Sequence, residues 1–225
     1  MLVEFIAVTV EDAKLIEKSG ADRIELVSGL TEGGLTPSYG LIEKVVKSVN
    51  IPVNVMVRPH GQSFCYSEED IEIMKNDINV IRSLGTNGIV LGVLDNQGNV
   101  DFKLLEELLS EVGSMDVTFH RAIDNANNMV EAAGKLDIYK EIKTILTSGG
   151  NGDWQSRIET LKQMKERCKE TDILIGSGLT KDNVRAVHEQ VGTGFYHFGT
   201  AIREDNSPLK RVSLKKAVDI IHTLK

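Results

Sequence analysis

Eight short apolar runs alternate with longer helical patterns along the whole chain. The runs are Leu2–Val8, Arg23–Val27, Val53–Val57, Gly88–Leu94, Asp116–His120, Lys143–Thr147, Asp172–Gly176 and Gly194–Phe198. Each run has the length of a strand, and each is followed by a segment long enough for a crossover helix. Strands that alternate with helices form βαβ units, and such units assemble into parallel sheets. The pattern therefore predicts a parallel α/β fold.

Eight such units fit a closed barrel better than an open sheet. The 225 residues give each unit about 28 residues, slightly fewer than in a typical (β/α)₈ barrel of ~250 residues. The main alternative is an open doubly wound sheet, which would carry a glycine-rich dinucleotide fingerprint after its first strand. No such motif follows Val8. We therefore predict one domain, residues 1–225, folded as a (β/α)₈ TIM barrel.

Several helices are marked at their first turn. Thr9 and Ser67 each precede an acidic turn, so each hydroxyl can cap a helix. Thr36 precedes Pro37, and proline is tolerated at the first helical position because an N–H there has no helical partner. We expect helices to begin directly after Thr9, Thr36 and Ser67.

Charge and composition exclude several classes of partner. The formal net charge is −7 and no run of lysine or arginine provides a basic face, so we expect no nucleic-acid partner. No stretch approaches the roughly 18–20 apolar residues of a membrane span, and the first residues show no targeting pattern. Cys65 and Cys168 are far apart and form no metal-binding or disulfide framework. We expect a cytoplasmic protein with no membrane partner.

Charged residues inside the predicted strands are unusual because both faces of a barrel strand are normally apolar. In the second strand Arg23 and Glu25 share one parity and the other parity is apolar, so we expect both to face the lumen. Glu4 lies in the first strand, and Arg58 and His120 lie at the ends of the third and fifth. Buried charges need a partner or a ligand. Two interpretations stay open: an ion network at the barrel base, or a ligand site at the C-terminal mouth.

The segment after the fifth strand combines three kinds of polar group. His120 is titratable near neutral pH, Arg121 provides a guanidinium, and Asp124 a carboxylate. Together they offer an acid–base group beside an anion clamp. The alternative is that Arg121 or Asp124 is an ordinary surface residue or a helix cap.

Glycine-rich turns follow the last three predicted strands. They contain Ser148 and Gly149 after the sixth strand, Gly176, Ser177 and Gly178 after the seventh, and Gly199 and Thr200 after the eighth. Many barrels bind phosphate at the last two of these positions through backbone N–H groups. The alternative is that these glycines only permit sharp turns. His197, inside the eighth run, is either a ligand-binding residue or a satisfied core histidine.

Several of these segments resemble the CutC family, which is named for a proposed role in copper homeostasis. The matching stretches are residues 20–26, 32–42, 55–59, 64–67, 118–124 and 146–150, in the same order as in the family. The resemblance implies a cytoplasmic, often homo-oligomeric (β/α)₈ protein. It also places eight residues at the family's characteristic positions: Glu4, Arg23, Glu25, Arg58, His120, Arg121, Asp124 and Ser148.

The chain departs from the family pattern in two places. Many relatives carry cysteines where this chain has Ile6 and Val27, and thiolates are the soft ligands that Cu(I) prefers. Cys65 remains as a candidate copper(I) ligand, and no other cofactor is indicated. Relatives usually end their last strand with His-Ala-Ser-Ala-Arg, whereas this chain runs on from His197 through Gly199 and Thr200 to Arg203. No role is therefore carried over to Arg203.

Three functions follow from these observations. The family resemblance implies a part in copper homeostasis. The polar lumen favours an enzyme that acts on a small anionic metabolite, with His120 as general acid or base and Glu25 or Glu4 as its partner. Arg58 and Arg121 would then hold the anion. The third is a metabolite-binding protein that uses the same pocket without turnover.

Overall fold

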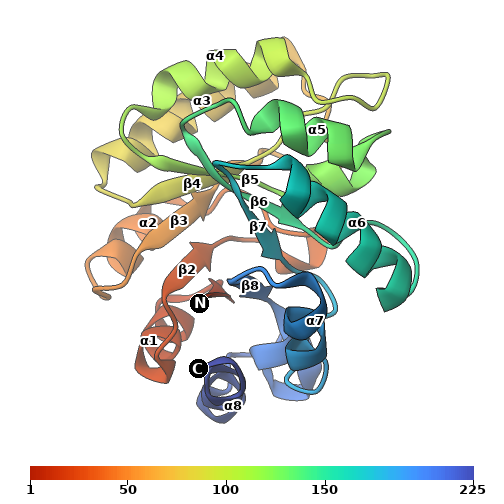
Figure 1. Ribbon diagram of the computed structural model, residues 1–225. Helices are drawn as coiled ribbons and strands as arrows, with labels where there is room; N and C mark the ends of the chain where they lie inside the picture. Colours follow the sequence, from red (N-terminus) through yellow and green to blue (C-terminus); the bar gives the residue numbers. More distant parts are fainter.

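A computed structural model describes residues 1 to 225. Its eight strands are parallel and close into a barrel in the order β1 to β8, with β8 paired back to β1. Helices surround the strands on the outside (Figure 1). The predicted TIM barrel is confirmed.

The strands begin and end close to the predicted positions. They are β1 (Leu2–Ala7), β2 (Arg23–Leu26), β3 (Val53–Met56), β4 (Gly88–Leu91), β5 (Asp116–Phe119), β6 (Ile142–Thr147), β7 (Asp172–Ile175) and β8 (Phe195–Phe198). The largest difference is in β4, which ends at Leu91 and not at Leu94. Leu94 leaves the barrel to form an antiparallel bridge with Val100.

Eight α-helices follow the strands, and four short 3₁₀ helices lie in the loops. The α-helices are α1 (Val10–Ser19), α2 (Tyr39–Val46), α3 (Glu68–Ser83), α4 (Phe102–Val112), α5 (Met129–Leu136), α6 (Trp154–Arg167), α7 (Val184–Val191) and α8 (Leu214–Leu224). The 3₁₀ helices are η1 (Leu30–Glu32), η2 (Arg121–Asn125), η3 (Thr200–Ile202) and η4 (Glu204–Asn206). None of the α-helices combines the length and apolar content needed to cross a bilayer.

Two of the three predicted helix starts are confirmed. The hydroxyls of Thr9 and Ser67 accept hydrogen bonds from the third residue of α1 and of α3, at 3.0 and 3.2 Å. The start after Thr36 is wrong, since α2 begins at Tyr39 and is capped by Ser38. The Thr36 hydroxyl accepts the backbone N–H of Arg58 instead, at 2.9 Å. It therefore fastens the loop after β2 to the end of β3.

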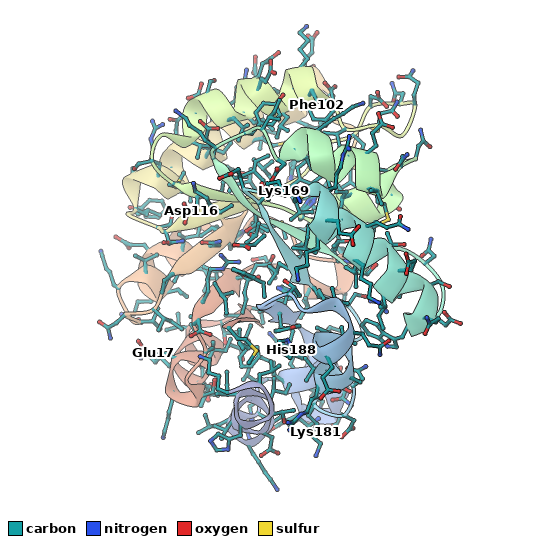
Figure 2. The ribbon with its side chains drawn as sticks, viewed as in Figure 1. Glu17, Phe102, Asp116, Lys169, Lys181 and His188 are labelled. Atoms are coloured by element: carbon teal, nitrogen blue, oxygen red, sulfur yellow. The ribbon has the colours of Figure 1, made fainter.

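The main apolar core lies between the strands and the surrounding helices. Val53 and Val55 of β3 belong to it, as do the residues of the same parity in the other strands. Figure 2 shows side chains filling this layer, where His188 of α7 meets the Tyr196 hydroxyl of β8 at 2.7 Å. Each fully buried aliphatic or aromatic side chain contributes about 1.5–3 kcal/mol to the free energy of unfolding. This layer supports the strands whose ends carry the site.

The strand residues of the opposite parity face the lumen, and some of them are polar. Arg23 and Glu25 of β2 are both buried there, as the alternation predicts. A small apolar cluster of Ile6, Val27, Met56 and Val90 is separate from the main core, and Ile6 pairs with Glu25 in the strand register. The lumen therefore holds both buried charges and apolar side chains.

The first and last parts of the chain close the barrel together. In Figure 1 the two termini lie close to each other, and α1 and α8 are neighbours there. Arg203, which follows β8, is fully buried and lies 3.1 Å from the carboxylate of Asp12 in α1. Its Nη2 also donates to the backbone carbonyl of Ile6 in β1, at 3.0 Å. The loop after β8 is thus tied to β1 and α1.

Candidate functional site

A cavity of about 500 Å³ opens at the C-terminal mouth of the barrel. Nine residues that the sequence marks as site candidates line it: Glu25, Arg58, His120, Arg121, Ser177, Gly178, His197, Gly199 and Thr200. They come from β2 and β8 and from the segments after β3, β5, β7 and β8. The closed barrel therefore brings together groups that are far apart in sequence.

The other candidates lie outside the cavity lining. Glu4 and Arg23 lie next to His197 in the strand register, at the floor. The remaining ones are Asp124, Ser148, Gly149 and Gly176, which belong to a network beside the cavity, and Cys65, on the loop after β3. These residues support the cavity or stand apart from it.

Glu4 is the centre of the ionic layer at the floor. One carboxylate oxygen lies 2.5 Å from Arg23 Nε and the other lies 2.7 Å from His197 Nδ1. The strand register places the three residues side by side, since Glu4 pairs with Arg23 on β2 and with His197 on β8. Burial opposes ionisation, but Arg23 and His197 outweigh it and lower the pKa of Glu4 to about 2. Glu4 is therefore a fixed negative charge that orients His197.

Glu25 and His197 form a second pair, which shares His197 with this layer. His197 Nε2 lies 3.8 Å from Glu25 Oε2, and both side chains line the cavity. Burial raises the pKa of Glu25 to about 7. Burial alone would lower the pKa of His197, but Glu25 and Glu4 outweigh it and raise that pKa above its ordinary value. Because the two groups titrate together, they can hold or release a proton near neutral pH.

His120 is held in one neutral tautomer. Its Nδ1 accepts the backbone N–H of Ala122 at 3.2 Å, so the proton of the neutral ring is on Nε2. Burial and the positive charge of Arg58 lower the pKa of His120 to about 3. The ring fits only because residue 92 is glycine, whose added Cβ would lie within 2.3 Å of His120 Nδ1. His120 is thus a hydrogen-bond donor at neutral pH.

The neutral state of His120 predicts a pH dependence of stability. The folded pKa lies below the ordinary 6.5, so its contribution to stability is complete above about pH 6.5 and is lost as the pH falls towards 3. At pH 4 this group alone would lower the free energy of unfolding by about 3 kcal/mol. Urea unfolding at pH 7, 5.5 and 4 should therefore show a shallower loss for His120→Gln than for the wild type.

A matched control is His222→Gln. His222 is exposed on α8 and does not line the cavity. We expect it to lose stability in parallel with the wild type. If the free energy of unfolding of His120→Gln falls with pH as steeply as that of the wild type, His120 is not held neutral by the fold.

Arg58 projects from the end of β3 beside His120. Its Nη1 donates to the backbone carbonyls of Glu32 and Gly34, at 2.8 and 3.1 Å. The Phe64 ring covers the guanidinium carbon at 4.8 Å and lies 5.0 Å from the ring of His120. The loops after β2 and β3 therefore hold Arg58 in place at the cavity wall.

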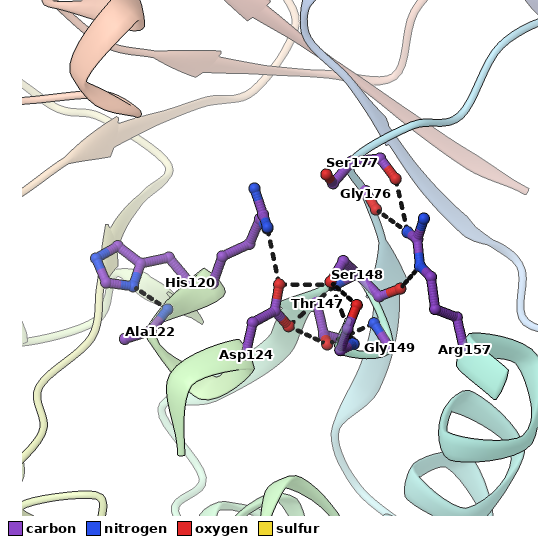
Figure 3. A network of polar contacts seen from close by, with 11 residues as sticks. His120, Ala122, Asp124, Thr147, Ser148, Gly149, Arg157, Gly176 and Ser177 are labelled. Atoms are coloured by element: carbon purple, nitrogen blue, oxygen red, sulfur yellow. Dashed lines mark hydrogen bonds and ion pairs between the residues drawn. The ribbon is translucent and has the colours of Figure 1, made fainter. Parts of the chain in front are cut away.

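Asp124 organises the network beside the cavity (Figure 3). Its carboxylate accepts hydrogen bonds from Arg121 Nε at 2.8 Å, the Thr147 hydroxyl at 2.6 Å and the Ser148 backbone at 3.1 Å. In Figure 3 the His120 ring is turned away from this network. Asp124 thus joins the end of β6 to η2 and directs Arg121 towards the mouth.

Arg157 of α6 braces the glycine-rich turns. Figure 3 shows it reaching the backbone carbonyls of Ser148, Gly176 and Ser177, at 2.5, 3.3 and 2.6 Å. Its guanidinium also stacks on Trp154, 3.8 Å from the ring centroid. The turn after β7 is therefore fixed by a side chain that sequence analysis did not single out.

Soft metal ligands are scarce at the mouth. The Cys65 thiol donates to the backbone carbonyl of Asp95 at 3.3 Å and is not part of the cavity lining. Ile6 and Val27, the positions at which the resemblance implies cysteines in relatives, belong to the apolar cluster in the lumen. The group whose ligand atoms lie close enough to hold a metal is Glu4, Glu25 and His197. Carboxylates and imidazole are harder ligands than Cu(I) prefers, so these residues do not fit copper(I).

We therefore expect weak copper(I) binding. Anaerobic titration against a competing chelator should give an affinity no better than that of free cysteine, because no two thiols converge. Cys65→Ser should leave the result unchanged. A tight site that Cys65→Ser abolishes would contradict this expectation.

The cavity also has an apolar wall, which no sequence motif marks. The wall consists of Ile6, Leu30, Met56, Phe64, Leu146, Leu179, Phe198 and Ala201. Met56 has the lumen-facing parity that the alternation in β3 predicts, and Ile6 has the same parity in β1. Leu30 and Phe64 lie on the long loops after β2 and β3, whose paths no periodicity indicates. The cavity therefore has a polar floor and a partly apolar wall.

Known proteins resemble this chain over most of its length. The sequence profile of the CutC family matches residues 1–202. The family protein CutC of Yersinia pseudotuberculosis is 40% identical over 200 residues, 84% of this chain and 78% of that protein. The one from Photorhabdus laumondii is 39% identical over 182 residues, 81% of this chain and 73% of that protein.

Solved structures agree with this assignment. The CutC protein from Streptococcus agalactiae superposes with a TM-score of 0.82 at 28% identity, over 89% of this chain and 98% of that one. Phosphoribosyl anthranilate isomerase from Thermotoga maritima gives a TM-score of 0.69 at 14% identity, over 100% of this chain and 98% of that one, and shows the shared barrel fold only. With the barrel, the motifs and these relatives in agreement, the chain belongs to the CutC family.

Proposed function

We propose that this protein is an enzyme that uses Glu25 and His197 as an acid–base pair on a small anionic metabolite. The observation that carries the proposal is the position of this pair, which lines the cavity floor while Glu4 holds His197 at Nδ1. A general acid or base needs a pKa near the working pH and a fixed orientation. Both groups have raised pKa values, that of Glu25 to about 7.

The surroundings of the pair support an enzymatic role. Glu4 and Arg23 do not reach the cavity, so they act as positioning residues for His197. This is the arrangement in which a buried carboxylate fixes the tautomer and orientation of a catalytic histidine. On this proposal His197, and not His120, is the general acid or base, because the low pKa of His120 keeps its ring neutral.

The cavity wall supports an anionic ligand. Arg58 and Arg121 both line it, and both carry a permanent positive charge. The volume of about 500 Å³ lies within the usual range of small-molecule sites. A binding protein without turnover would need these arginines but would have no use for Glu25 and His197 in their titratable arrangement.

Conversion of metabolites in a cell extract tests the proposal. The wild-type protein and Glu25→Gln are incubated with small molecules extracted from cells, and mass spectrometry follows which compounds are consumed and formed. We expect at least one anionic compound to be converted by the wild type and not by Glu25→Gln. Equal conversion by both proteins, or none by either, would contradict an enzymatic role for the pair.

A further inference from the structure

Two buried N–H donors on the cavity wall have no acceptor within the protein. They are Nε2 of His120 and Nε of Arg58, in residues that are 4% and 6% exposed. Both residues line the cavity that Glu25 and His197 also line. An unpartnered buried donor costs about 1–3 kcal/mol. Such a cost at two neighbouring groups indicates a ligand atom that accepts from them.

The two side chains that carry these donors lie against the same aromatic ring. Phe64 contacts both, with its ring 4.8 Å from the Arg58 guanidinium carbon and 5.0 Å from the His120 ring. Arg58 also contributes to the low pKa of His120. Backbone groups fix each side chain from behind, Ala122 for His120 and Glu32 for Arg58. Both side chains are therefore held in one orientation before a ligand binds.

We propose that His120 and Arg58 form an oxyanion site for the carbonyl oxygen of the substrate, and that the enzyme catalyses proton transfer at the adjacent carbon. This inference rests on the proposed function and names its substrate class, an anionic compound with a C–H bond next to a carbonyl. The Glu25–His197 pair at the floor supplies the base, and the two donors supply the stabilisation of the enolate.

The step balances without a further reactant. The basic member of the Glu25–His197 pair takes the proton from carbon, and the C–H electron pair becomes the C=C bond. The carbonyl π electrons move to oxygen, which accepts from His120 Nε2–H and Arg58 Nε–H. Return of the proton to the same or a neighbouring carbon yields an epimer or an isomer. A neutral imidazole suits this role because it donates to the developing enolate while remaining uncharged.

Solvent deuterium tests the reaction class. The metabolite extract is incubated with the wild-type protein in D₂O, and mass spectrometry measures deuterium that stays bound to carbon after return to H₂O. We expect the converted compound, or its unreacted pool, to gain carbon-bound deuterium. Conversion without carbon-bound deuterium would overturn the inference and leave the proposed function standing.

Oxalate tests the oxyanion site independently of turnover, because it is a planar anion that resembles the enolate of a 2-oxo acid. Isothermal titration of oxalate should show binding to the wild type. His120→Leu should weaken it about tenfold or more, since one hydrogen bond to a charged ligand is lost. His120→Gln retains an N–H donor and should bind within a few-fold of the wild type.

His222→Gln is the matched control for these variants, because His222 lies on α8 and is not part of the cavity lining. It should bind oxalate like the wild type. No oxalate binding to the wild type, or equal binding to His120→Leu, would overturn the oxyanion site. If Glu25→Gln converts metabolites like the wild type while oxalate binding still depends on His120, the proposed function fails and the donor site remains.

Discussion

Glu25→Gln is expected to abolish turnover and at the same time to make the protein more stable. The substitution removes one partner of the acid–base pair, which should lower the rate of conversion about 10²–10⁴-fold. The raised pKa of Glu25, about 7, means that the folded protein resists ionisation of this carboxyl. That resistance reduces stability as the pH rises from 4.5 to 7. Glutamine has the shape of the neutral carboxyl but cannot ionise, so the variant does not lose stability in this way.

The size of the stability gain depends on pH. At pH 8 the free energy of unfolding of Glu25→Gln should exceed that of the wild type by on the order of 3 kcal/mol, and at pH 4 the two should converge. Thermal and urea unfolding at both pH values measure the difference. Glu43→Gln is the control, since Glu43 lies on α2 and pairs only with the exposed Lys47. An active Glu25→Gln protein would remove Glu25 from the mechanism, and an equally stable one would show that its carboxyl ionises freely.

Asp12→Asn is expected to be among the most destabilising single substitutions. It leaves the guanidinium of Arg203 fully buried without its ionic partner. Breaking a buried pair from one side costs about 3–5 kcal/mol. For a domain of this size that corresponds to a decrease of roughly 10 °C in Tm. Differential scanning calorimetry at neutral pH would measure it.

Two further variants separate the buried charge from other effects. Asp12→Asn combined with Arg203→Met removes both charges and should recover part of the lost stability. Glu204→Gln breaks the neighbouring pair of Glu204 and Arg211, which is exposed, and should leave Tm unchanged within error. If the double variant is less stable than Asp12→Asn, the pair acts through packing and not through charge compensation.

The fold could be predicted because it depends on local patterns. Apolar runs, helical periodicity and the capping residues Thr9 and Ser67 act within a few residues of one another. The lumen-facing parity of Arg23 and Glu25 followed from alternation within a single strand. The error at Thr36 arose where a side chain bonds across the loop to Arg58 and not along its own helix.

The roles within the site depend on pairings that no local pattern contains. His197 gains its partner Glu4 only because β8 pairs with β1, across 193 residues of sequence. His120 is a fixed donor because the backbone of Ala122 occupies Nδ1 and because Gly92 leaves space for the ring. Arg203 showed no pattern of its own, and its partner Asp12 lies at the other end of the chain. The sequence shows which side chains could take part in chemistry, but it does not show which role each of them has.

The pairing of β1 with β8 also determines when the molecule can be completed during synthesis. β1 ends at Ala7, and its partner β8 begins only at Phe195. At translation rates of about 5–20 residues per second, one edge of β1 waits roughly 10–40 s for its hydrogen-bonding partner. During that interval the nascent chain exposes an unpaired strand edge, which is prone to association with other chains. Asp12 and Arg203 can likewise pair only after residue 203 has been made, so their ion pair fastens β8 to α1 late in assembly.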